Sequence, residues 1–172
     1  MIVVDTSALI SFAVGDAVEP VLEAFDVVTT QSVRTELKAT TDYDDRHGVG
    51  ATTALQAAGA FTVVEAQGEV FESSRIDAGE ASCVAVMRTC DADFLVTDDY
   101  RALPELQQLV DAEVVPSPVV LRALVKRGTW SEQRAKTAFE TIAEGARLVG
   151  CANLPVCTAA LRVGSFTAMS LR

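Results

Sequence analysis

The stretch IVVDTSALI, residues 2–10, decides the fold class, because it joins an apolar run to an acid. Residues 2–4 are apolar without polar alternation, which is typical of a parallel strand covered on both faces. Asp5 follows at the carboxyl end of this predicted strand. Open α/β sheets bind their ligands outside the carboxyl ends of the strands, so Asp5 is the first candidate site residue.

The same pattern continues along the chain, where short apolar runs alternate with longer helical patterns. We expect strands at Ile2–Val4, Val27–Thr30, Phe61–Glu65, Phe94–Thr97 and Glu113–Val115. We expect helices at Ser7–Val14, Val18–Ala24, Ser32–Ala39, Gly50–Ala58, Ala78–Thr89, Leu103–Val110 and Val119–Lys126. This alternation predicts a doubly wound α/β sheet with helices on both faces.

The pattern changes beyond Gly128. Ser131–Arg147 is predicted to form one further helix, with Ser131 as its N-cap and Trp130 packing before it. Residues 150–172 have no clear period and receive no assignment. We therefore divide the chain into a core at residues 1–128 and an extension of the same domain at residues 129–172.

The composition is acidic and aliphatic. The 172 residues carry a formal charge of −10, and Arg outnumbers Lys eleven to three. Such a surface favours solubility at high salt, as in halophilic proteins, and argues against a general nucleic-acid binder. Bound cations can nevertheless reverse the local sign of the charge. No apolar run approaches the ~18 residues that span a membrane, and the N-terminus lacks the basic start of a signal peptide, so we expect a cytoplasmic protein.

Several kinds of site are disfavoured. The four cysteines form no CxxC pair and His47 is the only histidine, which argues against zinc. Cys83 and Cys90 are best explained as small core residues. His47 lies in the charged segment DYDDRHG, which favours a solvated loop position, so no Ser–His–Asp set can be assembled. No glycine-rich phosphate loop is present either.

Acids from distant segments are expected at one edge of the sheet. Asp5, Asp98 and Asp99 follow predicted strands, Glu36 lies one turn into a helix, and Asp77 and Glu80 share a helix face. Two carboxylates ~4 Å apart repel by about 4 kcal/mol at an effective dielectric near 20. Such a cluster requires divalent cations or raised pKa values. Oxygen ligands without His or Cys select Mg²⁺ or Mn²⁺.

Each acid also has a purely structural explanation. Asp5 could cap the helix that follows it, and Asp77 with Glu80 could form a capping box. Glu36 could be a solvated helix position, and the pair at 98–99 could belong to a turn. Their convergence favours a metal site. Hydrolysis of a phosphodiester by a metal-activated water is the chemistry that such a site supports.

Four segments in order resemble the PIN-domain family: VVDTSALI at 3–10, VRTEL at 33–37, DAGEASCVAVM at 77–87 and FLVTDDYRAL at 94–103. PIN domains are the nuclease domains of many prokaryotic toxins and of several RNA-processing factors. The resemblance covers about residues 1–125, and the DxGEA form is similar to a prokaryotic subgroup. It implies a three-layer α/β sandwich with a central, mostly parallel sheet.

The resemblance also implies roles for individual residues. The catalytic acids of the family fall on Asp5, Glu36, Glu80 and Asp99. The metal ligands fall on Asp5, Glu80, Asp98 and Asp99, and the TDD run leaves open which of its two acids faces the ion. Thr6, Ser7, Asp77 and Thr97 fall on accessory positions.

The implied function is an endoribonuclease that depends on Mg²⁺ or Mn²⁺ and acts on RNA, in some family members as a toxin. Family members commonly form homodimers, and toxin members are silenced by a small antitoxin protein. Basic residues that could contact RNA are Arg34, Lys38, Arg46, Arg75 and Arg101. For any single one of them, an ordinary solvated side chain is the favoured explanation.

Three other functions fit the sequence less well. A non-catalytic PIN-like module could bind RNA or a protein, although the intact acidic set argues against it. An aspartyl-nucleophile phosphatase would need a second Asp two residues after the first, where Ser7 stands. A phosphoreceiver domain would need an early acidic pair and a late lysine at a strand end, and neither is evident.

Overall fold

A computed structural model describes residues 1–67 and 75–148 of the chain. Its sheet contains β1 (Ile2–Val4), β2 (Val27–Thr30), β3 (Thr62–Val64), β4 (Phe94–Val96) and β5 (Glu113–Val115). The strand order is β3-β2-β1-β4-β5, and every neighbouring pair is parallel. The predicted α/β class is confirmed. The chain winds outward from β1 to β3 and then returns to β4 on the other side of β1.

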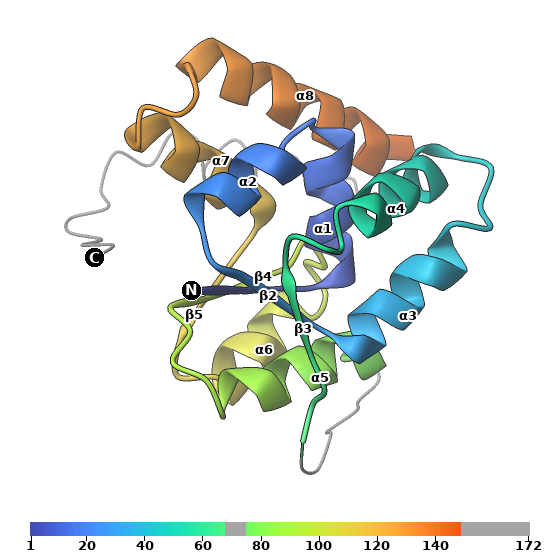
Figure 1. The fold of residues 1–172 in the computed structure, drawn as a ribbon, viewed down its shortest axis with the longest axis vertical. Coiled ribbons are helices and arrows are strands. Elements are labelled where there is room, and N and C mark those ends of the chain that lie inside the picture. Colours follow the sequence, from blue (N-terminus) through green and yellow to red (C-terminus); the bar gives the residue numbers. More distant parts are fainter. Residues whose placement is uncertain (68–74, 149–172) are drawn as a thin grey trace.

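Helices cover both faces of this sheet. They are α1 (Thr6–Val14), α2 (Val18–Ala24), α3 (Gln31–Thr40), α4 (Arg46–Gln56), α5 (Ala78–Met87), α6 (Leu103–Leu109), α7 (Ser117–Lys126) and α8 (Glu132–Leu148). In Figure 1, α5 and α6 lie below the sheet, and α1, α2 and α7 lie above it. Helix α8 packs on α7 and α1. The three layers match the predicted sandwich.

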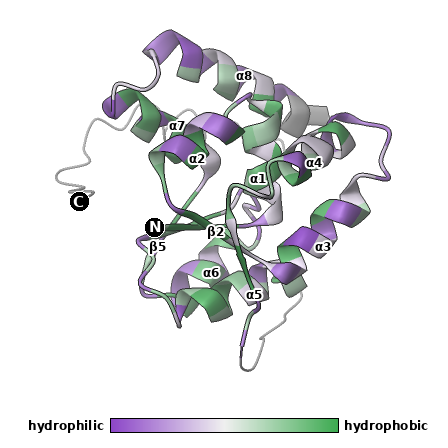
Figure 2. Cartoon of the chain, in the orientation of Figure 1, coloured by the Kyte–Doolittle hydropathy of each residue, from purple (hydrophilic) through white to green (hydrophobic). Residues whose placement is uncertain are grey.

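The centre of the sheet is its most apolar part, as Figure 2 shows by the green strands between purple-edged helices. Val3, Val4, Leu95 and Val96 of β1 and β4 are almost completely buried. Parallel strands that are covered on both faces lack polar alternation, which explains the uniform apolar runs in the sequence. Helix α5 is buried from Gly79 to Met87, and this accounts for the small apolar residues around its circumference.

Two helices begin two or more residues earlier than predicted. Helix α4 starts at Arg46, because Asp45 accepts hydrogen bonds from the amides of His47 and Gly48, at 2.8 and 3.0 Å. The loop assignment of His47 was therefore wrong: an N-cap inside the polar segment starts a helix there. Helix α7 starts at Ser117 and carries a proline in its first turn.

The C-terminal helix begins as predicted. The hydroxyl of Ser131 accepts a hydrogen bond from the Arg134 amide at 3.2 Å, and the guanidinium of Arg134 lies 4.4 Å from the centre of the buried Trp130 ring. Cys83 is buried and Cys90 is half-buried. Residues 150–172, including Cys151 and Cys157, lie outside the described residues. The boundary at residue 128 stays a prediction.

Within residues 1–67 and 75–148, no helix has both the length and the apolar character needed to cross a lipid bilayer.

Candidate functional site

The strand order reverses between β1 and β4, and this position determines where the site lies. The two strands are neighbours, with Val4 paired to Val96. Helix α1 leaves β1 towards one face of the sheet, and α6 follows β4 on the other face (Figure 1). A crevice therefore opens at their carboxyl ends, which is where open α/β sheets bind ligands. Asp5 and Thr97, the residues that follow the two strands, are brought together there.

Asp5 is 3% exposed and is held by hydrogen bonds on both carboxylate oxygens. Oδ1 accepts the Ala8 amide at 2.8 Å, Oδ2 accepts the Thr97 hydroxyl at 2.7 Å, and the Ser7 hydroxyl lies 3.0 Å from each oxygen. Asp5 is thus both the N-cap of α1 and a site residue. Burial raises its pKa to about 7, and the charge of Asp98 acts in the same direction, against the hydrogen bonds.

Asp77 and Glu80 form the capping box at the start of α5. Asp77 Oδ1 accepts the Glu80 amide at 2.9 Å, and Glu80 Oε2 accepts the Asp77 amide at 3.1 Å. Asp77 is exposed, whereas Glu80 is only 5% exposed. Burial raises the pKa of Glu80 to about 8, and the charges of Asp77, Asp5 and Asp99 add to this effect. Glu80 is therefore electrostatically coupled to acids from β1 and β4.

Glu36 lies where α1, α3 and α5 meet. Its Oε2 accepts a hydrogen bond from the Thr6 hydroxyl. A Cβ at Gly79 would overlap both carboxylate oxygens, with Oε1 only 2.5 Å away. Burial raises the pKa of Glu36, whereas the bonds from Thr6 and from the Gly79 amide lower it. The glycine of DAGEA is therefore required by the close approach of a carboxylate to the first turn of α5.

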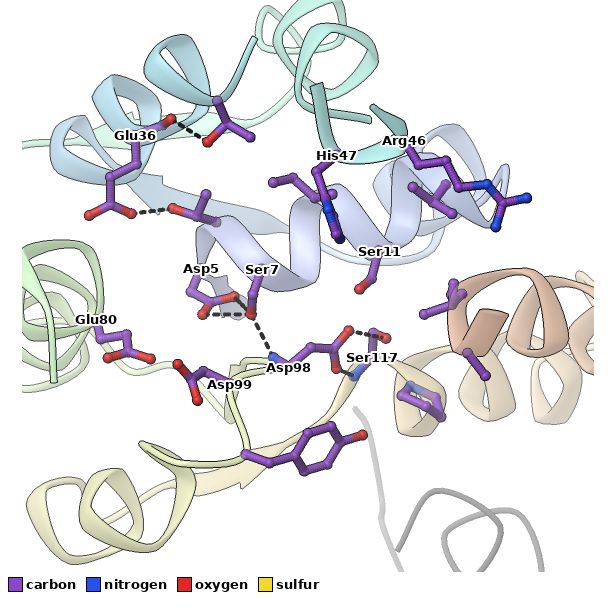
Figure 3. A pocket seen from close by; sticks show the side chains of 18 of the residues that line it. Asp5, Ser7, Ser11, Glu36, Arg46, His47, Glu80, Asp98, Asp99 and Ser117 are labelled. Atoms are coloured by element: carbon purple, nitrogen blue, oxygen red, sulfur yellow. Dashed lines mark hydrogen bonds between the residues drawn. The ribbon is translucent and has the colours of Figure 1, made fainter. Parts of the chain in front are cut away.

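The adjacent acids of the TDD run point in different directions (Figure 3). Asp98 points to Ser117, whose amide and hydroxyl donate to its two oxygens at 2.8 and 2.6 Å. Asp99 lies towards Glu80. Burial acts to raise the pKa of Asp99, but hydrogen bonds and the positive charge of Arg101 hold it below its ordinary value. The acid facing Glu80 is thus the one expected to stay ionised.

One cavity of about 480 Å³ brings these acids together. Its polar wall consists of Asp5, Thr6, Ser7, Glu36, Asp77, Glu80, Asp98 and Asp99. Figure 3 shows the labelled acids around the start of α1. Side chains from four segments that are far apart in the sequence therefore share one solvent-accessible space.

A family model described as a PIN domain matches residues 1–149. The chain belongs to the PIN-domain family. No protein of established function and no solved structure matches it significantly. The PIN domain is a nuclease-type fold, and the four motifs of this member meet at its cavity. The match also takes in α8, which lies beyond the segment where the motifs occur.

The donor chemistry of this PIN domain fits a hard divalent cation, because carboxylate and hydroxyl oxygens line the polar wall. Burial is the main cause of the raised pKa values of Asp5 and Glu80, and neighbouring carboxylates add to it, so a cation in the cavity would favour the ionised forms. In the described part of the chain, however, no three His, Cys, Asp or Glu side chains are grouped closely enough to hold an ion as they stand. Glu80 is turned back to the Asp77 amide, and Asp99 is paired with Arg101.

The basic residues expected to contact RNA are dispersed over this PIN domain. Arg46 lines the cavity. Arg101 is paired with Asp99 at 3.1 Å. Arg34 and Lys38 lie on α3, and Arg75 precedes α5.

Sequence reasoning missed part of the cavity wall. Beside the acids it includes Ile10, Ser11, Val14, Thr40, His47, Tyr100, Ser117, Pro118, Phe139, Ile142 and Ala143. One signal was available: Ser11 lies four residues after Ser7, so the two share a helix face. The residues of α8 carry no motif, and their position depends on how that helix packs.

Proposed function

We propose that this PIN domain is a divalent-metal-dependent endoribonuclease, a hydrolase of phosphodiester bonds in RNA. One observation carries the proposal: acids from four segments line a single cavity, and four of them, Asp5, Glu36, Glu80 and Asp98, have raised pKa values. Perturbed carboxylates in a cleft are typical of functional sites. The family supports nuclease chemistry in particular.

Asp5, Glu80 and Asp99 would hold Mg²⁺ or Mn²⁺. Asp98 lines the same cavity and would be the fourth acid able to bind the ion. The ion would supply positive charge for the phosphate oxygens and would lower the pKa of a bound water. The chain itself fixes Asp5 through Ser7 and Thr97 and keeps the carboxylate aimed into the cavity. Asp98 is oriented by Ser117 and supports the site electrostatically.

Glu36 is proposed as the group that accepts the proton of the attacking water. Burial raises its pKa above that of an ordinary glutamate, which makes the carboxylate a stronger base. Thr6 and the first turn of α5 hold its carboxylate at the cavity wall. The water oxygen would bond to phosphorus as the bond to the leaving ribose oxygen breaks.

The resemblance to toxins supports two further expectations, a small antitoxin protein as partner and a homodimer in solution. A second candidate function is a non-catalytic module that binds RNA or a protein. The hydrogen bonding favours it in one respect, because Glu80 and Asp99 are engaged by the Asp77 amide and by Arg101.

A cleavage assay with and without Mn²⁺ separates these candidates. The wild type is compared with Asp5→Asn and with Asp111→Asn, a control in which the altered acid is exposed and lies outside the cavity. Cleavage that needs Mn²⁺, is lost in Asp5→Asn and persists in Asp111→Asn supports the nuclease. RNA binding without cleavage at any metal concentration supports the non-catalytic module.

A further inference from the structure

The cavity does not end at the acids but continues along one face of α1. Ser7, Ile10, Ser11 and Val14 all line it, at the three- and four-residue spacing of a single helix face. At a rise of about 1.5 Å per residue, this face is ~10 Å long from Ser7 to Val14. Its first turn is polar and its last turn is apolar. One continuous space thus has an acidic end and an apolar end.

Helix α8 supplies the opposite apolar wall. Phe139, Ile142 and Ala143 are spaced as neighbours on one helix face, and all three line the cavity. Pro118 of α7 completes the wall. His47 and Arg46, in the first turn of α4, add polar groups to the same space, and both are labelled in Figure 3.

Two glycines pack closely against the apolar side chains that line this end of the cavity. A Cβ at Gly15 would lie 2.9 Å from Ile142 Cδ1. A Cβ at Gly50 would lie 3.1 Å from Ile10 Cγ2 and 3.2 Å from Val14 Cγ2. This close packing leaves Ile142, Ile10 and Val14 little room to change position, so the apolar end of the cavity is formed without a ligand.

We infer that the apolar end binds one unpaired nucleobase of the substrate, next to the phosphodiester that lies at the acids. This inference rests on the proposed function. A nucleobase has apolar faces, which suit Ile10, Val14 and Ile142, and a polar edge. His47 can meet this edge, and so can the oxygen of Ser11 as an acceptor, since the Ser11 hydroxyl is hydrogen-bonded to Asp98. The cation of Arg46 suits a neighbouring phosphate. Phosphate and base of one nucleotide are joined by a single ribose, a span that the α1 face accommodates.

A base in a helix is stacked and paired, so only a base that has left the stack can enter this end of the cavity. Because the net charge is −10, affinity for RNA depends on local contacts of this kind more than on a basic surface.

Calorimetry with small ligands tests the base pocket independently of catalysis. In Mn²⁺, the four ribonucleoside 5′-monophosphates are compared with ribose 5-phosphate, which lacks a base. At least one nucleotide should bind the wild type about tenfold more tightly than ribose 5-phosphate, the gain typical of one base contact. Equal affinities would overturn the inference, and this comparison needs no variant.

A variant that fills the pocket supplies the second arm. Ala143→Phe should lower nucleotide affinity about tenfold and leave that of ribose 5-phosphate unchanged. The control is Ala39→Phe, on the exposed side of α3 and outside the cavity, which should bind both ligands as the wild type does. With single-stranded RNA, Ala143→Phe should raise KM and leave kcat unchanged. Unchanged nucleotide binding in this variant would contradict the pocket.

Two further outcomes are distinct. Nucleotide binding without RNA cleavage would overturn the proposed nuclease and keep the base pocket. If no nucleotide binds, and sedimentation shows a dimer that Ala143→Phe dissociates, a second copy of the chain covers this wall and the inference is wrong.

Discussion

The hydroxyl of Thr97 donates a hydrogen bond to Asp5 Oδ2 at 2.7 Å, across 92 positions of sequence. The same hydroxyl accepts the Asp99 amide at 3.1 Å. Both Thr97 and Asp5 are buried, and they follow neighbouring parallel strands. One side chain therefore fixes the position of the acid at β1 relative to the backbone of the acid at β4.

Thr97→Val keeps the shape of this side chain and removes its hydroxyl. We expect the free energy of unfolding to fall by about 1 kcal/mol, since a buried carboxylate loses a donor. In the wild type the hydrogen bond from Thr97 lowers the pKa of Asp5, so the pKa should rise further when this bond is removed. Urea denaturation and the pH profile of cleavage check these two effects. Thr53→Val, which removes an exposed hydroxyl bonded only within its own helix, is the control.

The stability of the metal-free protein should depend on pH through Asp5 and Glu80. Their folded-state pKa values, about 7 and about 8, lie above the ordinary values of 3.8 and 4.5. Between these limits the folded state binds more protons than the unfolded state, so stability falls as pH rises from 4 to 8. Urea denaturation in EDTA at pH 5 and pH 8 measures the slope. It should flatten in Asp5→Asn and in Glu80→Gln.

Mn²⁺ should oppose this loss. The ion binds ionised carboxylates, so its stabilisation should be larger at pH 8 than at pH 5. A metal-free stability that increased with pH over this range would contradict the raised pKa values. Equal Mn²⁺ affinity in the wild type and in Asp5→Asn would show that Asp5 is not a metal ligand.

Gly79→Ala tests the contact between Glu36 and α5. Alanine in a helix interior is normally more stable than glycine by about 0.5–1 kcal/mol. Here the added Cβ would overlap the Glu36 carboxylate, so we expect lower stability and a loss of cleavage. The matched change is Gly59→Ala, where a Cβ meets nothing within 4 Å. If Gly79→Ala stabilised the protein and stayed active, Glu36 would not need its present position.

The two acids of the capping box are expected to have different roles: Asp77 stabilises the helix, and Glu80 takes part in cleavage. Asp77→Ala removes an N-cap and should cost about 1 kcal/mol, with a modest loss of activity. Glu80→Gln keeps the bond to the Asp77 amide and removes only the ability of this side chain to ionise, so it should preserve stability and abolish cleavage. Melting temperatures and initial rates of cleavage are measured for both variants. If Asp77→Ala abolished cleavage and Glu80→Gln lowered only stability, Asp77 would be the functional acid and Glu80 the structural one.

Salt should affect the proposed cleavage by this PIN domain less than cleavage by a nuclease with a basic groove. Monovalent salt weakens phosphate contacts, but it also screens the repulsion between RNA and a chain of charge −10. We expect cleavage at fixed Mn²⁺ to stay level or rise as KCl increases towards about 1 M, where the Debye length is ~3 Å. A steep fall would show that a local basic surface controls binding.

Local chemistry explains which features could be predicted. Asp5 and the acids at 98–99 were found because apolar runs end directly before them. The box at Asp77 and Glu80 was found because its spacing is itself a helix signal. His47 was misplaced, because the N-cap that starts α4 lies in a segment with many acids. Ser117 was missed for a similar reason, since its helix was expected two residues later.

Long-range packing explains the rest. The side chains of Phe139 and Ile142 carry no motif, and a helical period alone does not show which partner a helix face contacts. Their place in the cavity depends on the contact of α8 with α1, where Gly15 allows Ile142 to approach closely. Information of this kind exists only in the folded chain.

One apolar wall of the cavity comes from a later part of the sequence than the acids. The acids come from residues 5–99, whereas Phe139, Ile142 and Ala143 come from a single later helix. Exchange of that helix alone would alter this apolar wall and leave every acid in place. Recombination or design could thus change what the cavity accepts without changing its acidic end.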